Sequence, residues 1–220
     1  MESFFNAVLQ RWPVGRQDYH WHILWPNAVV ESVLVQPYQG LTHGREGVEP
    51  VPARWVHLTV LHAPPVEETS PEQIEQMIAL VRQQCPAVSP WQAIVHPPSV
   101  DRVGVACRVE PEPEARQLWQ ITRAATREVM GDQGLTYPQG EYHPHTTLAY
   151  GTGSTRPAVV RQQMNAWMNK HIALPPASLA VTQLSLVQQS HNGRHITWRH
   201  VVDVPLAGQA RGPAARQTPR

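Results

Sequence analysis

One strand-like pattern occurs twice in this chain, and it constrains the fold more than any other feature. The segment "WVHLTVLH" covers residues 55–62 and "EYHPHTTLAY" covers residues 141–150, so that the first His-x-Thr begins at His57 and the second at His145. Each segment is followed by a helix-like stretch and then by two strand-like runs. Two halves with the same order of elements indicate two related lobes.

The size and composition favour a globular protein without a dominant charge. A chain of 220 residues can bury one sizeable core or two closely packed lobes. Hydrophobic residues make up 41% and charged residues 16%, as in soluble globular domains. The net charge of +1 excludes a broad positive field for nucleic acid. Two cysteines, Cys85 and Cys107, are too few for a disulfide framework and are expected to be buried.

Neither a membrane span nor a secretory signal is predicted. No apolar run approaches the roughly 20 residues that cross a bilayer. The N-terminus "MESFFNAVLQRWPVG" lacks a basic segment followed by an apolar one, so a cytoplasmic location is expected. We expect a single bilobal domain over residues 1–206, a disordered basic tail over 207–220, and a monomer.

Three helices and several strands are predicted from periodicity and end signals. The clearest helix begins after Ser70, which forms a capping-box pattern with Gln73. Further helices are expected at 112–130 and 156–170, and a shorter one at 27–41, limited by Pro37. Residues 40–53 are expected to form a loop. The predicted strands cover 19–25, 54–62, 91–96, 102–109 and 145–150, followed by "SLAVTQLSLVQQ" and "HITWRHVVDVPL".

The order of these elements predicts an α+β fold. The last two strand-like runs are joined through Asn192-Gly193, a strong hairpin signal. Helices mixed with hairpins, without a series of βα units, do not indicate a doubly wound parallel sheet.

The two repeated strands place an imidazole and a hydroxyl on the same face. Alternate residues of a strand point to one side, so His57 and Thr59 lie about 7 Å apart along one face. His145 and Thr147 share a face in the same way. The opposite face carries apolar residues: Val56, Leu58 and Val60 in the first strand and Leu148 in the second.

This pairing suits a phosphoryl group. An imidazole can accept or donate a proton near neutral pH, and a threonine hydroxyl can donate to a phosphate oxygen. Two such strands side by side would place one imidazole on each side of a phosphorus atom. One histidine would deprotonate the attacking water while the other protonates the leaving oxygen, without a metal.

A third copy of the pattern, His195-Ile196-Thr197, serves as an internal control. It is followed by Trp198 instead of an aliphatic residue and belongs to a hairpin that the first half lacks. His-x-Thr alone is therefore a weak signal, and the matched spacing and context of the other two copies carry the interpretation.

With its two motifs "HLTV" and "HTTL", the chain resembles the 2H phosphoesterases, which include 2′-5′ RNA ligase-like proteins and cyclic phosphodiesterases. It looks closest to the bacterial 2′-5′ RNA ligase-like branch, through "YHWHIL" and "PHTTLAY". The resemblance covers residues 19–206. It implies two pseudo-symmetric lobes with antiparallel sheets flanked by helices and a central cleft. It also implies metal-independent chemistry, with no cofactor, on 2′,3′-cyclic phosphates or 2′-5′ linkages of a nucleotide or RNA end.

Carried over by motif position, His57 and His145 would be the acid/base pair, and Thr59 and Thr147 would bind phosphate. Many ligase-like members have a basic residue shortly after the second motif, where this chain has Tyr150. Further candidates for substrate contact are the aromatic and histidine residues expected near the cleft: His20, Trp21, Tyr142 and Tyr150.

Two other interpretations stay open. His20 with His22, or His143 with His145, has the spacing of a zinc-binding pair, which would make the protein a metal hydrolase. A non-catalytic module that binds a nucleotide or RNA end is the second alternative. His62 is expected to point to the face opposite His57 and to be structural.

Overall fold

The computed structural model describes residues 1–135, 142–171 and 174–207. The expected tail from residue 208 onward and Glu141 lie outside the described residues. The helices are α1 (Phe4–Val8), α2 (Asn27–Val30), α3 (Gln39–Thr42), α4 (Pro71–Gln84), α5 (Glu112–Met130) and α6 (Pro157–His171). The strands are β1 (Asp18–Ile23), β2 (Val48–Pro50), β3 (Leu58–Pro65), β4 (Trp91–Val95), β5 (Ser99–Val100), β6 (Gly104–Glu110), β7 (His145–Gly151), β8 (Ala177–Val181), β9 (Gln183–His191) and β10 (Ile196–Pro205).

The strands form one strongly curved sheet in the order β10-β9-β1-β3-β7-β6-β4-β8, with β2 paired to β7 and β5 paired to β6. All of these pairs are antiparallel. We call β10-β9-β1-β3 the first lobe and β7-β6-β4-β8 the second lobe. The predicted α+β fold with antiparallel sheets and flanking helices is confirmed.

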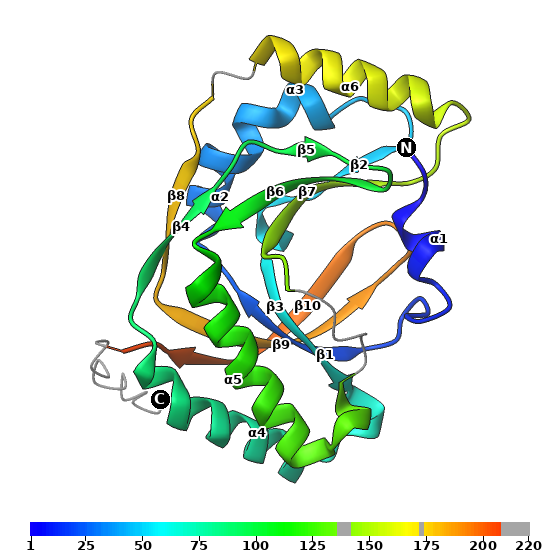
Figure 1. Cartoon of the computed structure of the whole chain (residues 1–220). Coiled ribbons are helices and arrows are strands. Elements are labelled where there is room, and N and C mark those ends of the chain that lie inside the picture. Colours follow the sequence, from blue (N-terminus) through cyan, green and yellow to red (C-terminus); the bar gives the residue numbers. More distant parts are fainter. Residues whose placement is uncertain (136–141, 172–173, 208–220) are drawn as a thin grey trace, which may run out of the picture.

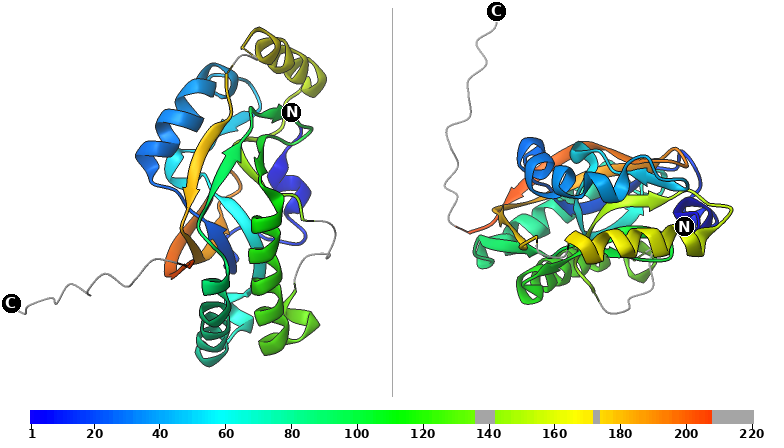
Figure 2. Two further views of the ribbon diagram at one scale, coloured as in Figure 1. Left: turned by 60° about the vertical axis from the view of Figure 1, so that its left-hand side comes forward. Right: turned by 90° about the horizontal axis from the view of Figure 1, so that it is seen from above.

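The helices cover the two ends of the molecule. In Figure 1, α4 and α5 lie against the first lobe at the bottom, and α3 and α6 lie at the top, over β2 and β5 of the second lobe. Figure 2 shows α4 and α5 side by side at one end and α6 at the other. The helix α5 connects two strands of the second lobe but packs on the first, against β3 and α4. The connection therefore crosses between lobes instead of forming a βαβ unit.

The sequence signals for the start of α4 and for the turn between β9 and β10 are confirmed. The Ser70 hydroxyl accepts a hydrogen bond from the backbone N–H of Gln73, whose side chain accepts one from the Ser70 N–H, which completes the capping box of α4. The buried stripe of this helix is Ile74, Met77, Ile78 and Val81. Gly193 has φ +83 in the turn between β9 and β10, as a hairpin turn requires.

The structure departs from the predicted local structure at three places. The loop expected over residues 40–53 contains the end of α3 and the whole of β2. Helical backbone covers the range predicted at 27–41, but Pro37 does not limit it, because residues 31–35 form a π-helical turn, residues 36–38 a 3₁₀ turn, and the helical backbone continues into α3. The run "SLAVTQLSLVQQ" forms two strands instead of one. Its first part, β8, pairs with β4 up to Val181, and its second part, β9, pairs with β1 and β10 from Gln183 onward.

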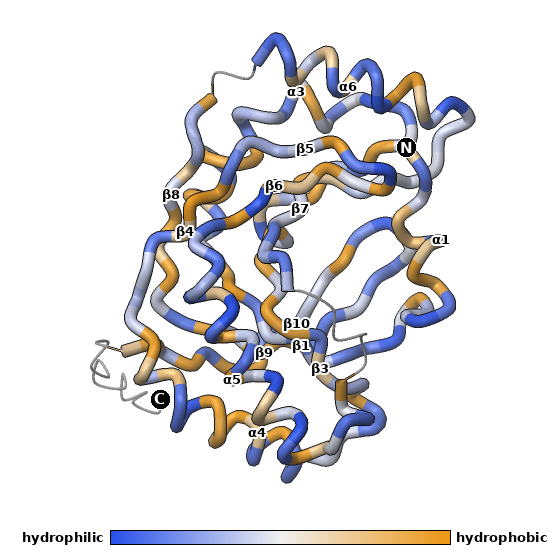
Figure 3. The backbone as a smooth tube through the Cα atoms, viewed as in Figure 1, coloured by the Kyte–Doolittle hydropathy of each residue, from blue (hydrophilic) through white to orange (hydrophobic). Residues whose placement is uncertain are grey.

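The apolar residues of the strands and of the inner helix faces form one continuous core. Figure 3 shows how apolar residues recur along these strands and helices. Both cysteines are buried in it, as expected. Within the described residues, no helix is long and apolar enough to span a membrane.

The end of β7 packs closely against the N-terminal segment. A Cβ atom on Gly151 would overlap the carbonyl oxygen of Glu2 and lie 3.0 Å from that of Val103. We therefore expect Gly151→Ala to lower the free energy of unfolding by about 1–3 kcal/mol through overpacking, measured by urea denaturation. The exposed neighbour Thr152→Ala is the control and should leave it within about 0.5 kcal/mol. Equal stability of the two variants would contradict this packing.

Candidate active site

The two His-x-Thr motifs lie side by side at the junction of the lobes. Strands β3 and β7 pair only at Leu58 and Thr146 among the described residues, in antiparallel orientation. Both of these residues are 0% exposed. Alternate side chains of a strand point to opposite sides. The two histidines and two threonines of the motifs therefore lie together on the face opposite Leu58 and Thr146: His57, Thr59, His145 and Thr147.

Both motif histidines are held in the same way. The Nδ1 atom of His57 lies 2.9 Å from the carbonyl oxygen of Trp55, and that of His145 lies 2.9 Å from the carbonyl oxygen of His143. Since a carbonyl only accepts hydrogen bonds, each Nδ1 carries the proton. In the neutral rings, Nε2 is therefore the free proton acceptor, and after protonation it becomes a donor. Each imidazole can serve as general base or general acid.

The backbone around the motifs repeats this symmetry. Val60, the fourth residue of the first motif, is skipped in the register between β1 and β3, and Leu148 is skipped in the same way between β6 and β7. A bulge immediately after each threonine thus bends both strands at equivalent places. The Tyr142 hydroxyl also donates to the carbonyl of Thr59 over 3.1 Å, which ties the approach to the second motif to the first.

The two histidines differ in their surroundings. His57 is 8% exposed, whereas His145 is exposed to solvent. Burial, opposed by the hydrogen bond to Trp55 and reinforced by nearby His145, lowers the pKa of His57 to about 4. At neutral pH His57 is therefore uncharged and ready to accept a proton.

His57 is surrounded by aromatic rings. The ring of His22 is stacked on it at 4.1 Å between centroids, and Trp198 meets it edge-on at 4.9 Å. Trp55 in turn packs edge-on against Trp198 at 4.8 Å. The positions of Trp198 and His22 beside the site are not predicted from the sequence, because no local pattern indicates contacts between β10, β1 and the first motif.

His62 lies on the cleft side, contrary to the prediction from simple alternation. The bulge at Val60 shifts the register, so that His20 pairs with His62 and His22 with Thr59. Cross-strand partners share a face, and the rings of His20 and His62 are 4.4 Å apart. Burial lowers the pKa of His62 to about 3 and the pKa values of His20 and His22 well below 6.5.

The buried histidines predict a specific loss of stability in acid. Unfolded histidines bind protons below about pH 6.5, whereas these folded ones resist protonation down to pH 3–4. The unfolded state therefore gains protons first, and each buried imidazole lowers the free energy of unfolding by about 1.4 kcal/mol per pH unit below 6.5. Between pH 6.5 and 5.5, where the unfolded histidine is only partly protonated at the start, we expect His62→Phe to reduce the loss by about 1 kcal/mol, measured by urea denaturation with the same variant at pH 8 as reference. A loss equal to that of the wild type would contradict the assignment.

Several predicted substrate contacts are covered by other side chains. Trp21 is 1% exposed and lies on the opposite face of β1 from His20 and His22. His20 is 2% exposed and lies beside Trp12. Tyr150 is 4% exposed and packs against Phe4 and Phe5 of α1. Direct contact with a substrate is therefore not expected at these three residues, because the N-terminal segment and the first-lobe core cover them.

Tyr142 is half-buried, with its ring stacked on Trp119 at 5.8 Å. Through its hydroxyl it supports the backbone of Thr59. The third motif copy also has a structural explanation, since Nε2 of His195 lies 2.9 Å from a carboxylate oxygen of Glu49. Arg102 pairs with Glu2, and Arg54 lies over the ring of Trp55 at 5.5 Å.

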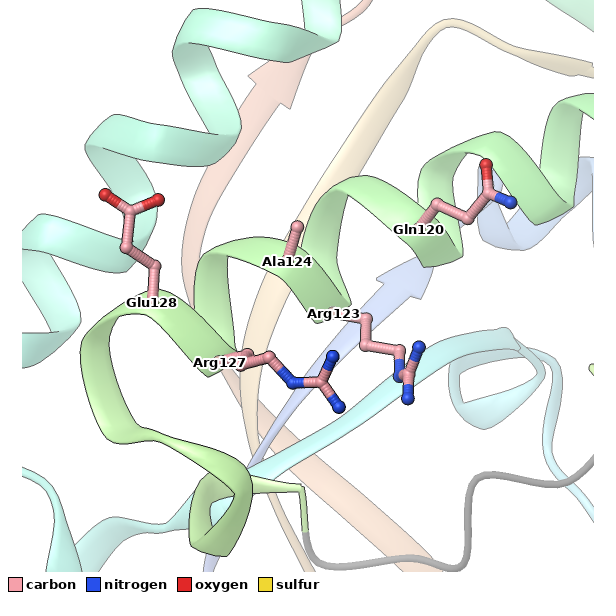
Figure 4. A pocket seen from close by; sticks show the side chains of 5 residues that line it. All are labelled: Gln120, Arg123, Ala124, Arg127 and Glu128. Atoms are coloured by element: carbon pink, nitrogen blue, oxygen red, sulfur yellow. The ribbon is translucent and has the colours of Figure 1, made fainter.

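The metal interpretation finds no geometric support in residues 1–135, 142–171 and 174–207, where no group of three or more His, Cys, Asp or Glu residues could hold an ion. A separate surface hollow of about 330 Å³ is lined by side chains of α5 alone. Arg123 and Arg127 extend to the same side of the helix there (Figure 4). It contains no residue of either motif.

Comparison with known proteins identifies the family. The profile of the 2′-5′ RNA ligase superfamily matches residues 26–193. The chain belongs to the 2′-5′ RNA ligase superfamily. No curated protein sequence matches it significantly. Membership of this superfamily supports phosphoesterase activity.

Solved structures of the superfamily fold are similar over most of their length. TT0787 of Thermus thermophilus has 19% identity and a TM-score of 0.65, with 88% of this chain and 100% of that chain covered. E. coli LigT complexed with 3′-AMP has 18% identity and a TM-score of 0.61, with 88% and 99% covered. A crystal structure described as a phosphoesterase has 17% identity, the same TM-score and the same coverage. At these identities the likeness establishes the fold.

Proposed function

We propose that the protein is a metal-independent phosphodiesterase that opens 2′,3′-cyclic phosphates or cleaves 2′-5′ linkages of nucleotides or RNA ends. The observation that carries the proposal is the matched pair of imidazoles. Each is fixed through Nδ1 by the carbonyl two residues earlier, and each has a threonine on the same face two residues later.

The different burial of the two histidines favours a division of roles. His57 is buried and neutral, so it takes the proton from the attacking water. The proton for the leaving ribose oxygen is assigned to the other motif histidine, His145, which is exposed to solvent. The water oxygen forms the new bond to phosphorus as the bond to the ribose oxygen breaks. Thr59 and Thr147 donate hydrogen bonds to the non-bridging oxygens.

Ligands of a related fold are consistent with a nucleotide substrate. LigT has been crystallised with 3′-AMP, with phosphate and with ATP. Trp198 and Trp55 stand beside His57 and supply aromatic surface for a base. Strand ligation would be the reverse of the same chemistry.

The test is hydrolysis of the four 2′,3′-cyclic mononucleotides in the presence of EDTA, with products resolved as 2′- or 3′-phosphates. The proposal predicts turnover that EDTA does not reduce. Turnover abolished by EDTA and restored by a divalent metal would show a metal hydrolase instead. Nucleotide binding without turnover of any cyclic or 2′-5′ substrate would show a binding module.

A further inference from the structure

A second histidine lies directly beneath the proposed base. His22, on β1, is 0% exposed and pairs across the strands with Thr59 on one side and Ser185 on the other. Its ring lies nearly parallel to that of His57, with 20° between the planes and 4.1 Å between centroids. One face of the His57 ring is thus covered by an imidazole that solvent does not reach.

No hydrogen bond within the described residues explains why a polar ring occupies this position. Neither Nδ1 nor Nε2 of His22 has a partner there, although buried polar groups in proteins are nearly always hydrogen-bonded. The contacts of His22 are ring contacts: with His57, with His20 at 5.5 Å and with Trp198 at 5.4 Å. The position therefore provides a flat ring for stacking.

The titratable groups around the two stacked rings are mostly other imidazoles. His20 on β1, His62 on β3 and His145 on β7 all disfavour a positive charge on the stacked pair. On β9 and β10, Ser185 donates to the carboxylate of Asp203 over 2.6 Å. That carboxylate also bonds Nε2 of His200 over 2.8 Å.

The carboxylate of Asp203 is thus hydrogen-bonded to Ser185 and His200. In the described residues, no carboxylate hydrogen-bonds the ring of His57, whose hydrogen bond goes to the carbonyl of Trp55. Nothing in the immediate surroundings of His57 within those residues compensates a positive charge by an ion pair.

We propose that His22 is a positioning residue: its buried ring seals one face of His57 from water and so keeps His57 the proton acceptor of the pair. This inference rests on the proposed phosphodiesterase function. The exposed His145 is left as the proton donor. In the ring-opening step, the water proton moves to Nε2 of His57, and the leaving ribose oxygen takes the proton from Nε2 of His145. A proton exchange with solvent then resets both rings.

The inference is tested by two substitutions that differ in what they leave beneath His57. In His22→Phe a flat ring still covers the His57 imidazole, whereas in His22→Ser water can enter the space. The protonation of His57 is followed by NMR of ¹³C-labelled histidine between pH 5.5 and 8, with its signal assigned by its absence in His57→Ala. His195→Ser, immediately before β10, is the control.

In the wild type, the control and His22→Phe, we expect His57 to stay neutral over the whole range. In His22→Ser it should titrate within the range, and kcat/KM should fall about tenfold between pH 6.5 and 5.5, as for a base that becomes protonated. A His22→Ser protein whose His57 stays neutral would overturn the inference. If that variant does not fold, His22→Phe decides alone: titration of His57 within the range, or a loss of kcat above 100-fold, would overturn it.

The NMR titration needs no turnover. A protein in which His57 behaves as expected but which hydrolyses no cyclic phosphate would refute the proposed function and leave the role of His22 in place.

Discussion

Replacing either motif histidine by alanine is expected to lower kcat/KM on the productive substrate by about 10²- to 10⁴-fold, the usual contribution of a positioned general acid or base. His57→Ala removes the proton acceptor, and His145→Ala removes the donor on the other side of the phosphorus. Because both histidines act in the same step, the kcat/KM of the double variant should be little lower than that of the less active single variant. The measurement is steady-state hydrolysis with EDTA present.

His195→Ala is the matched control for these two substitutions. It removes a histidine from the same His-x-Thr pattern, but from a hairpin position where His195 is paired with Glu49. Its kcat/KM should stay within about twofold of the wild type, because the contact with Glu49 is partly exposed and such a contact contributes little to stability. Equal losses in all three variants would show that the motif pattern has no special role at His57 and His145.

Replacing either motif threonine by valine is expected to lower kcat by about 10²-fold, as loss of one donor to a developing negative charge does. Valine has nearly the shape of threonine, so the packing around Thr59 and Thr147 is kept and only the hydroxyl is lost. The losses should appear in kcat more than in KM, since the hydrogen bond strengthens as charge develops in the transition state.

Thr146, the residue before Thr147, provides a matched control, because the same Thr→Val substitution can be made there. Thr146 is 0% exposed, lies on the opposite face of β7, and its hydroxyl has no hydrogen-bond partner in the described residues. Thr146→Val should therefore leave kcat unchanged and stability equal or slightly higher, because it removes a buried unpaired hydroxyl. A similar loss of kcat in Thr146→Val and Thr147→Val would show that the effect comes from packing.

The parts of the site that the sequence predicts correctly are those set by short-range geometry. Strand alternation places His57 with Thr59 and His145 with Thr147, and two matched strands predict that the pairs meet. The capping box at Ser70 and the Asn192-Gly193 turn are equally local, since their signals lie within four residues.

What the sequence does not show depends on register and on distant contacts. The bulge at Val60 reverses the face of His62, and no single residue marks a bulge in advance. The covering of Tyr150 by Phe4 and Phe5 joins residues from distant parts of the chain. The stacking of His22 on His57 requires β1 to lie beside β3, which alternation within one strand cannot reveal.

The central claim is that both imidazoles act on one phosphorus atom, and a crystal structure of the protein with inorganic phosphate tests it most directly. We predict one phosphate with Nε2 of His57 and Nε2 of His145 each within about 3.2 Å of its oxygens, and with the hydroxyls of Thr59 and Thr147 on the remaining oxygens. A phosphate that contacts only one of the two histidines, or that binds away from both motifs, would contradict the account.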